Sequence, residues 1–207
     1  MYVSDILRFA ADCQQREDYA HHMNADIHQE TTGPRETSID IHVPELMAVL
    51  APWRDVTISI AAKGVPPHLT LLYPWRTPPL TAQDLAALHG AIADYEPFPI
   101  TFTSLGRFSP TVLFLQLADD TAILALMRAI HTVFPDTPPY GGAFPLPTPH
   151  LTVAKATSDA ELDQLEQEVT ITLAPNLPLV VQVQQIVVME DDHNGDWHNI
   201  AIIPLAH

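Results

Sequence analysis

The chain has 207 residues, of which 47% are hydrophobic, and its net charge at neutral pH is −16. This length and apolar content predict a globular protein with one large domain or two small lobes. Nine Lys and Arg residues stand against 25 Asp and Glu, which argues against a protein that grips long nucleic acid through many phosphate contacts. Any nucleic-acid substrate is therefore expected to be short, or contacted at one end.

Residues 1–37 are expected to form an N-terminal helical or irregular extension. The N-terminus lacks the basic-then-apolar pattern of a signal peptide, and no segment reaches the roughly 20 apolar residues of a membrane helix. These features predict a cytoplasmic protein. The adjacent His21 and His22 have no spaced carboxylate or Cys partner, so we expect them to be exposed rather than to bind a metal.

From residue 38 onward, the chain reads twice as strand, helix, motif strand, helix, strand. These ten elements, predicted from apolar periodicity and capping residues, are expected at residues 38–43, 45–53, 67–72, after the N-cap Thr81, 99–105, 111–117, 119–133, 149–154, after the N-cap Ser158, and 179–189. A last strand is expected at residues 199–205. The repetition predicts a two-lobed domain over residues 38–207, with lobes at about 38–110 and 111–207 whose sheets can intertwine.

The two motif strands have nearly the same sequence: residues 67–71 read Pro-His-Leu-Thr-Leu, and residues 149–153 read Pro-His-Leu-Thr-Val. A lone His-x-Thr is weak evidence in a chain with 11 His. Five matched positions that occur twice, in contrast, indicate a duplicated functional element. Each segment follows a Pro and is rich in Leu, Val and Thr, which favours a β-strand.

Side chains alternate between the two faces of a strand. The first motif strand is therefore expected to place His68, Thr70 and Leu72 on one face, and the second repeats this arrangement with His150 and Thr152. Each strand offers an imidazole and a hydroxyl together.

Few cations lie near the motifs in sequence; they are Lys63, Arg76, Arg107 and Lys155. The same alternation points Lys155 away from His150. We therefore expect Lys155 to be solvated rather than catalytic.

Two histidines held across a cleft are suited to cleavage of a phosphodiester. One imidazole removes the proton of the attacking hydroxyl or water, and the other donates a proton to the leaving oxygen. Histidine meets this need because its pKa lies near neutrality, and the Thr hydroxyls can donate hydrogen bonds to the non-bridging oxygens. This chemistry needs no metal and no cofactor. The near-identical flanks give no asymmetry that would separate the acid from the base.

The paired His-Leu-Thr strands resemble the two-histidine (2H) phosphoesterase superfamily, and most closely its bacterial 2′-5′ RNA ligase-like and cyclic phosphodiesterase branch. The resemblance covers about residues 38–205 and rests mainly on residues 67–74 and 140–154. It implies an α+β, bilobal fold with pseudo-two-fold duplication, in which antiparallel sheets line a central cleft and helices lie outside.

The resemblance also implies roles for particular residues. His68 and His150 would be the catalytic acid-base pair, and Thr70 and Thr152 would bind the phosphate. The implied substrates are 2′,3′-cyclic phosphates, 2′-5′-linked nucleotides or RNA ends, and related small cyclic nucleotides. Two aromatic residues, Tyr140 and Phe108, are candidates for walls that stack on a base, although packing explains them equally well.

Three other interpretations stay open. A nucleotide-binding module without turnover would use the same four side chains. A phosphodiesterase that degrades cyclic oligonucleotide signals would belong to the same superfamily. A metal-dependent hydrolase would use His193, His198 and the nearby Asp residues, but Asn194-Gly195 between two apolar strands favours a hairpin turn there.

Overall fold

The computed structural model describes residues 35–144, 146–192, 194 and 196–206, so residues 1–34 of the extension expected over residues 1–37 lie outside the described residues. The strands are β1 (Thr37–His42), β2 (His68–Leu72), β3 (Phe98–Phe108), β4 (Val112–Leu117), β5 (Leu151–Lys155), β6 (Leu179–Val183), β7 (Gln185–Asp191) and β8 (Trp197–Pro204). The α-helices are α2 (Met47–Thr57), α3 (Ser59–Ala62), α4 (Ala82–Ile92), α5 (Thr121–Val133) and α6 (Asp159–Leu173). Short 3-10 turns lie at Pro44–Leu46, Pro139–Gly142 and Ala174–Asn176. Every described helix is too short or too polar to cross a bilayer.

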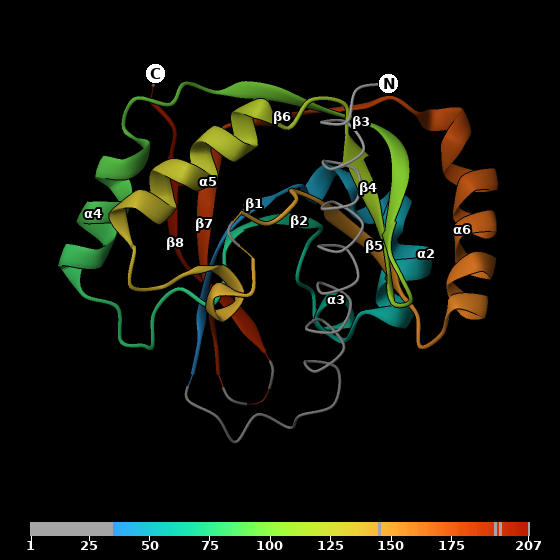
Figure 1. The fold of residues 1–207 in the computed structure, drawn as a ribbon, viewed down its shortest axis with the longest axis horizontal. Helices are drawn as coiled ribbons and strands as arrows, with labels where there is room; N and C mark the ends of the chain where they lie inside the picture. Colours follow the sequence, from blue (N-terminus) through green and yellow to red (C-terminus); the bar gives the residue numbers. More distant parts are fainter. Residues whose placement is uncertain (1–34, 145, 193, 195, 207) are drawn as a thin grey trace, which may run out of the picture.

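The strands pair antiparallel in the order β6-β3-β4-β5-β2-β1-β7-β8 (Figure 1). The two motif strands, β2 and β5, are neighbours at the centre. On one side of this pair lie β1, β7 and β8, and on the other lie β4, β3 and β6. Each half of the sheet thus takes strands from both halves of the sequence, and the duplication becomes a pseudo-two-fold arrangement about the β2–β5 pair.

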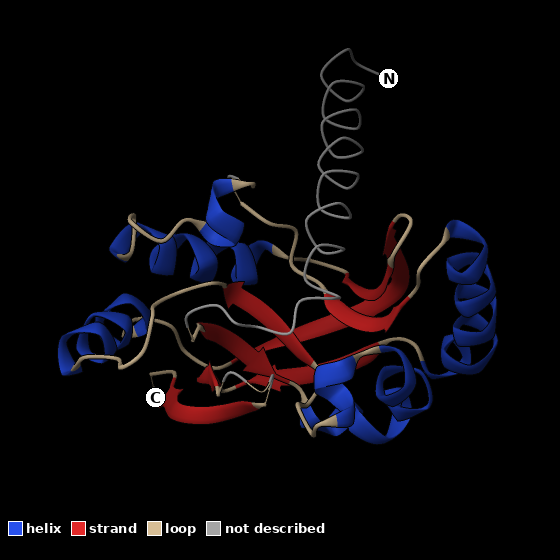
Figure 2. Cartoon of the chain, turned by 90° about the horizontal axis from the view of Figure 1, so that it is seen from below, coloured by secondary structure: helices blue, strands red, loops and turns tan. Residues whose placement is uncertain are grey.

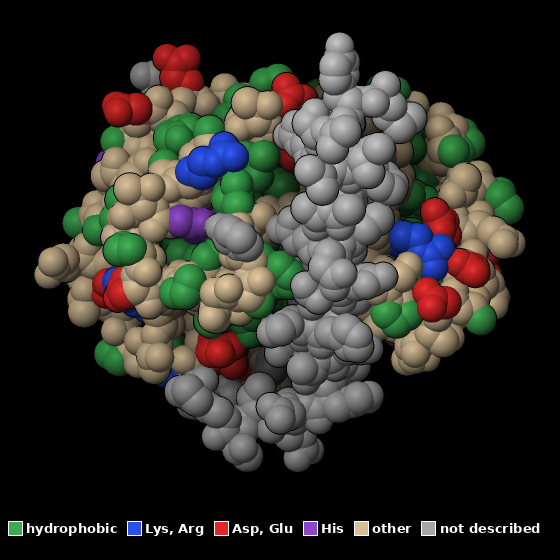
Figure 3. All heavy atoms as spheres, in the orientation of Figure 1, with side chains coloured by type: hydrophobic (Ala, Val, Ile, Leu, Met, Phe, Trp, Pro, Cys, Tyr) green, Lys and Arg blue, Asp and Glu red, His purple; other side chains and the backbone are tan. Residues whose placement is uncertain are grey.

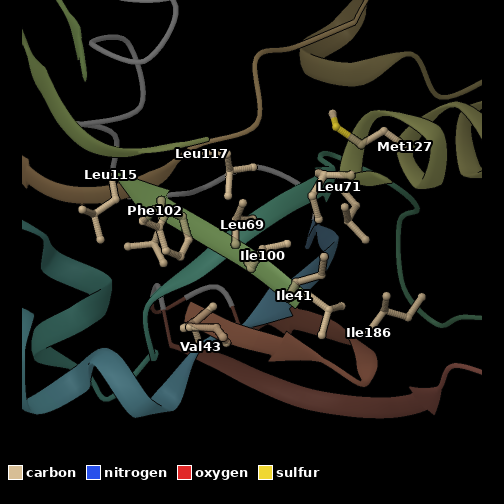
Figure 4. Packing of buried hydrophobic residues seen from close by; sticks show 14 of the residues in the cluster. Ile41, Val43, Leu69, Leu71, Ile100, Phe102, Leu115, Leu117, Met127 and Ile186 are labelled. Carbon is tan, nitrogen blue, oxygen red and sulfur yellow. The ribbon is translucent and has the colours of Figure 1, made fainter. Parts of the chain in front are cut away.

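The helices lie around the outside of this curved sheet, as Figures 1 and 2 show. Helix α2 packs on β5, α5 packs on β2, α6 packs on β4, and α4 packs on α5. The core fills the space between the sheet and these helices; Figure 4 shows Ile41, Leu69, Leu71 and Met127 in it. The expected α+β class, with helices outside antiparallel strands, is confirmed. The helices do not cover the opposite face of the central strands, where polar side chains are expected.

Capping residues begin two helices where the sequence predicts. The Thr81 hydroxyl accepts a hydrogen bond from the Asp84 backbone N–H, and the Asp84 side chain accepts one from the Thr81 backbone, which makes a capping box for α4. The Ser158 side chain accepts from the Glu161 backbone N–H at the start of α6.

The expected continuous strand over residues 179–189 is wrong, because the chain breaks at Gln184 into β6 and β7. Strand β6 pairs with β3, whereas β7 pairs with β1. One linking residue spans only about 7 Å between flanking Cα atoms, so the sheet must curl until these strands approach each other. The apolar alternation gives no sign of this change of partner.

The expected direction of Leu72 is also wrong. Along the β1–β2 pair, Ile39 lies opposite Leu72 but Asp40 lies opposite Thr70, so Leu71 is an extra residue in β2. Such a bulge reverses the alternation beyond it. Leu72 therefore lies in the core rather than on the face of His68 and Thr70.

Candidate active site on the open face of the central strands

The structure brings the two motifs side by side on neighbouring strands. Leu69 of β2 lies directly opposite Leu151 of β5 in antiparallel register, and both are buried in the core. The residues on either side of this pair point to the other face of the sheet. One polar face therefore carries four side chains, those of His68, Thr70, His150 and Thr152. The two histidines are diagonal neighbours, and such positions lie about 7–8 Å apart.

Each motif histidine is held by the same hydrogen bond. His68 Nδ1 lies 2.9 Å from the Pro66 carbonyl oxygen, and His150 Nδ1 lies 2.9 Å from the Thr148 carbonyl oxygen. A carbonyl only accepts, so each Nδ1 carries the hydrogen and donates it. The remaining nitrogen, Nε2, is then the one that exchanges a proton. The two rings therefore have the same tautomer, with the hydrogen on Nδ1.

Burial lowers the pKa of His68 and that of His150, each to about 4. The bond to the Pro66 carbonyl opposes this decrease at His68, while the cations of Arg54 and Lys155 add to it. At His150, the nearby His68 and Lys155 also lower the pKa. Both imidazoles are therefore neutral near pH 7 in the absence of a bound anion.

An aromatic cluster supports the ring of His150. Phe108 and Phe114 stack on each other at 4.4 Å between ring centroids, and each meets His150 edge to face, at 5.0 and 5.4 Å. Phe144 belongs to the same buried cluster. Phe108 is 1% exposed, so its observed contacts hold the imidazole, and stacking of Phe108 on a base stays a prediction.

Tyr140 packs against this aromatic cluster from the loop before the second motif. Its backbone N–H donates to the Tyr73 carbonyl over 2.7 Å, and the two tyrosine rings meet edge to face at 6.1 Å. Its φ of 50° is the only positive value at a described residue other than Gly. Such backbone strain often accompanies functional sites. The loop that carries Tyr140 is thus attached to the end of the first motif strand.

Two polar residues of β1 lie beside the first motif, and the sequence interpretation missed them. Asp40 lies opposite Thr70 and His42 lies opposite His68, with 6.3 Å between the imidazole centroids. The Ser38 hydroxyl donates to Asp40 over 2.5 Å. The signal was available, because Ser38, Asp40 and His42 alternate with Ile39 and Ile41.

Asp40 is buried, His42 is half-buried, and the pKa of each is shifted. Asp40 is 2% exposed, and burial raises its pKa to about 6. Burial also lowers the pKa of His42 to about 4. Among the described residues, Asp40 Oδ1 and His42 Nε2 have no hydrogen-bond partner. The first motif therefore has a polar neighbour strand, whereas the second has an aromatic one.

Lys155 lies on the site face, and the expectation that it points away from His150 is wrong. Strand β5 pairs with β4 so that Thr152 lies opposite Phe114, and the register then shifts by one residue before Lys155. This second bulge reverses the alternation. The Lys155 ammonium is close enough to lower the pKa of both His68 and His150. Only strand pairing reveals this, since nothing in the local sequence marks a bulge.

The segment considered for a metal joins two paired strands. Asp191 at the end of β7 lies opposite Trp197 at the start of β8, as expected for a hairpin. His198 Nε2 lies 3.8 Å from Asp192 Oδ2. Within the described ranges, no three His, Cys, Asp or Glu side chains are grouped to hold a metal ion; His193 is outside those ranges.

On the face drawn in Figure 3, the Lys and Arg side chains stand apart from one another. Arg107 bonds Asp163 and Glu166 of α6, at 2.6 and 3.1 Å. Arg76 likewise bonds Asp84 and Asp136. The acidic partners neutralise these two cations. The Lys155 ammonium is among the charges that lower the pKa of both motif histidines.

Comparison with known proteins adds to this geometry. The sequence matches the 2′-5′ RNA ligase superfamily over residues 43–195, which includes both motifs. The chain belongs to this superfamily of two-histidine phosphoesterases. A Geobacillus thermodenitrificans protein described as "Putative phosphoesterase" is 24% identical over 137 residues, which are 64% of this chain and 75% of that protein.

Solved structures with the 2′-5′ RNA ligase-like fold also match. E. coli LigT complexed with 3′-AMP has a TM-score of 0.57 at 17% identity, covering 84% of this chain and 99% of LigT. The protein TT0787 of Thermus thermophilus has a TM-score of 0.54 at 19% identity, covering 82% of this chain and 97% of TT0787. At these identities the likeness concerns the fold, and membership of the superfamily makes the protein a phosphoesterase.

Proposed function

We propose that this protein is a metal-independent phosphodiesterase that hydrolyses a 2′,3′-cyclic phosphate, or a 2′-5′-linked nucleotide or RNA end. The observation that carries the proposal is the matched placement of His68 and His150. Both are on one face of adjacent strands, and both rings are held through Nδ1. E. coli LigT has been solved with 3′-AMP and with NADP+, and a small nucleotide is the kind of ligand proposed here.

In the proposed reaction, one imidazole takes a proton from water at its Nε2 as the water oxygen forms a bond to phosphorus. The other imidazole, as imidazolium, donates a proton to the ribose oxygen as the bond between that oxygen and phosphorus breaks. Thr70 and Thr152 donate hydrogen bonds to the non-bridging oxygens, where negative charge is held. All four roles are filled by side chains, and none is left for a metal.

The low pKa of both histidines fits this scheme once the charge of the substrate is included. A phosphate anion between the rings favours their protonated forms and raises their pKa. Substrate binding therefore supplies the imidazolium that the free enzyme lacks at neutral pH. Lys155, which faces the same space, offers a second positive charge for the phosphate.

The first test is hydrolysis of 2′,3′-cyclic AMP and of a 2′-5′-linked dinucleotide in excess EDTA. We expect turnover of at least one of them at the same rate as without chelator, because the acid, the base and the phosphate ligands are side chains. Product is measured by chromatography, with a cyclic dinucleotide as a third substrate.

Each other outcome of this test overturns the proposal in a different way. Activity that EDTA abolishes and a divalent cation restores would indicate the metal-dependent hydrolase with His193 and His198. Tight binding of the nucleotides in equilibrium dialysis without turnover would indicate the binding module. Turnover of the cyclic dinucleotide alone would indicate an enzyme that degrades cyclic oligonucleotide signals.

A second test concerns Lys155. We expect Lys155→Met to raise KM for the cyclic phosphate about 10- to 100-fold, since a charge-assisted contact to phosphate is worth roughly 1.5–3 kcal/mol. The acidic limb of the pH–rate profile should also move to higher pH, because a cation that lowers the pKa of both histidines is gone. Lys63→Met, which changes an exposed lysine, is the matched control. Equal KM values for the two variants would show that Lys155 does not bind the phosphate of the substrate.

A further inference from the structure

Arg54 is a buried cation bonded to backbone carbonyls. It lies in the last turn of α2 and is 3% exposed. Its Nη1 donates to the Thr152 carbonyl over 2.7 Å, and its Nη2 donates to the Val65 and Pro66 carbonyls over 3.4 and 3.3 Å. In the described part of the chain, no carboxylate pairs with it. A charge is rarely buried without such a partner, so its position calls for an explanation.

The carbonyls that Arg54 bonds belong to the second motif strand and to the two residues just before the first motif. Thr152 is in the second motif strand, and Pro66 immediately precedes the first motif. The Pro66 oxygen is also the acceptor that holds the His68 ring through Nδ1. One planar guanidinium with several fixed donors thus bonds the backbone of β5 and the segment that orients His68, a geometry that lysine cannot reproduce.

Pairing between the two motif strands is short, which makes this connection important. The ladder between β2 and β5 has one registered pair, Leu69 with Leu151, whereas β1 and β2 share four. The separation of the two histidines is therefore held by few backbone bonds of its own. A rigid bond between the strands at this point limits their relative movement.

We propose that Arg54 is a positioning residue, which holds the two motif strands together and sets the orientation of the His68 ring. The proposal rests on the proposed function, because that function requires both imidazoles to meet one phosphate. The cation also acts on His68 directly, since it is among the charges that lower the pKa of this ring. Arg54 itself touches no reacting atom.

The test compares Arg54→Lys with Arg54→Gln, and uses Arg107→Gln as a matched control with partners on α6. Lysine keeps the positive charge and the aliphatic part of the side chain, but it lacks the planar guanidinium with several N–H donors. We expect it to lower kcat about 10- to 100-fold with KM within about threefold of the parent, since small misplacement of catalytic groups has effects of this size. Arg54→Gln should lower kcat at least as much, and Arg107→Gln should leave it unchanged.

The second readout is titration of the His68 ring by NMR, which requires no turnover. The ring should titrate at a higher pH in Arg54→Gln than in the parent, and at nearly the parent pH in Arg54→Lys, because only glutamine removes the charge. If the parent cleaves none of the substrates, the proposed function fails, and this titration still tests the effect of Arg54 on His68.

Three results would overturn the positioning role. The first is a folded Arg54→Lys variant with the parent kcat. The second is a loss of activity in both Arg54 variants that appears only as a rise in KM. The third is an unchanged His68 titration in Arg54→Gln. If the glutamine variant does not fold, kcat and KM of the lysine variant decide the question.

Discussion

Replacing either motif histidine by alanine is expected to lower kcat for phosphodiester hydrolysis by about a hundredfold or more, the usual contribution of a general acid or base. The reason is the shared geometry of His68 and His150, whose Nδ1 atoms are engaged with carbonyls so that each Nε2 handles a proton. Nucleotide affinity should stay within a few-fold, because Thr70 and Thr152 still bind the phosphate.

The measurement is steady-state kinetics of both variants across pH. The parent kcat should give a bell-shaped profile, and removal of one histidine should abolish one limb. His89→Ala, which changes an exposed histidine on α4, should behave as the parent. If both motif variants are folded and turn over at the parent rate, the histidines are structural and the proposed mechanism is wrong.

The second large effect is expected on stability. The free energy of unfolding of Asp40→Asn should exceed that of the parent by about 3 kcal/mol at pH 8, and the difference should fall below about 1 kcal/mol near pH 4. Burial raises the pKa of Asp40 from 3.8 to about 6. The stability that its proton contributes is therefore fully present below pH 3.8 and is lost as the pH rises through 6. Asparagine never carries the buried charge.

Urea unfolding at several pH values measures this difference. The surrounding hydrogen bonds should tolerate the change, since the Asn oxygen can accept from Ser38 and its amide can donate to the nearby Thr70 hydroxyl. Asp94→Asn, an exposed control that follows α4, should alter stability by less than about 0.5 kcal/mol. An Asp40→Asn variant less stable than the parent at pH 8 would mean that its neighbours stabilise the carboxylate more than burial destabilises it.

The surroundings of the two motifs differ, although the motif sequences are nearly the same. The two motif strands are nearly identical, but the strand beside the first carries Asp40 and His42, and the strand beside the second carries Phe114. Pseudo-two-fold symmetry therefore holds for the backbone and fails for the chemistry. A substrate that places unlike groups on either side of its phosphate can bind such a site in one orientation.

Much of this protein is predictable from local sequence. The motif strands, the helices after Thr81 and Ser158, and the α+β class follow from apolar periodicity, capping residues and turn formers, all of which act within a few residues. The joint placement of the histidines and threonines on one face follows from alternation over three positions, and both bulges fall just beyond them, at Leu71 and Val153. The polar face of Ser38, Asp40 and His42 could have been recognised in the same way.

The amino-acid sequence by itself therefore determined the two motifs, the elements that carry them and the superfamily. Only the tertiary structure decided that β2 and β5 are neighbours, that Lys155 faces the site, that the chain changes partner at Gln184 and that Arg54 links β5 to the segment just before β2. Each of these depends on which strand or helix lies alongside. A bulge arises from the register between two strands, and a buried guanidinium bonds whichever carbonyls packing brings to it. Alternation and capping carry no information about partners distant in sequence.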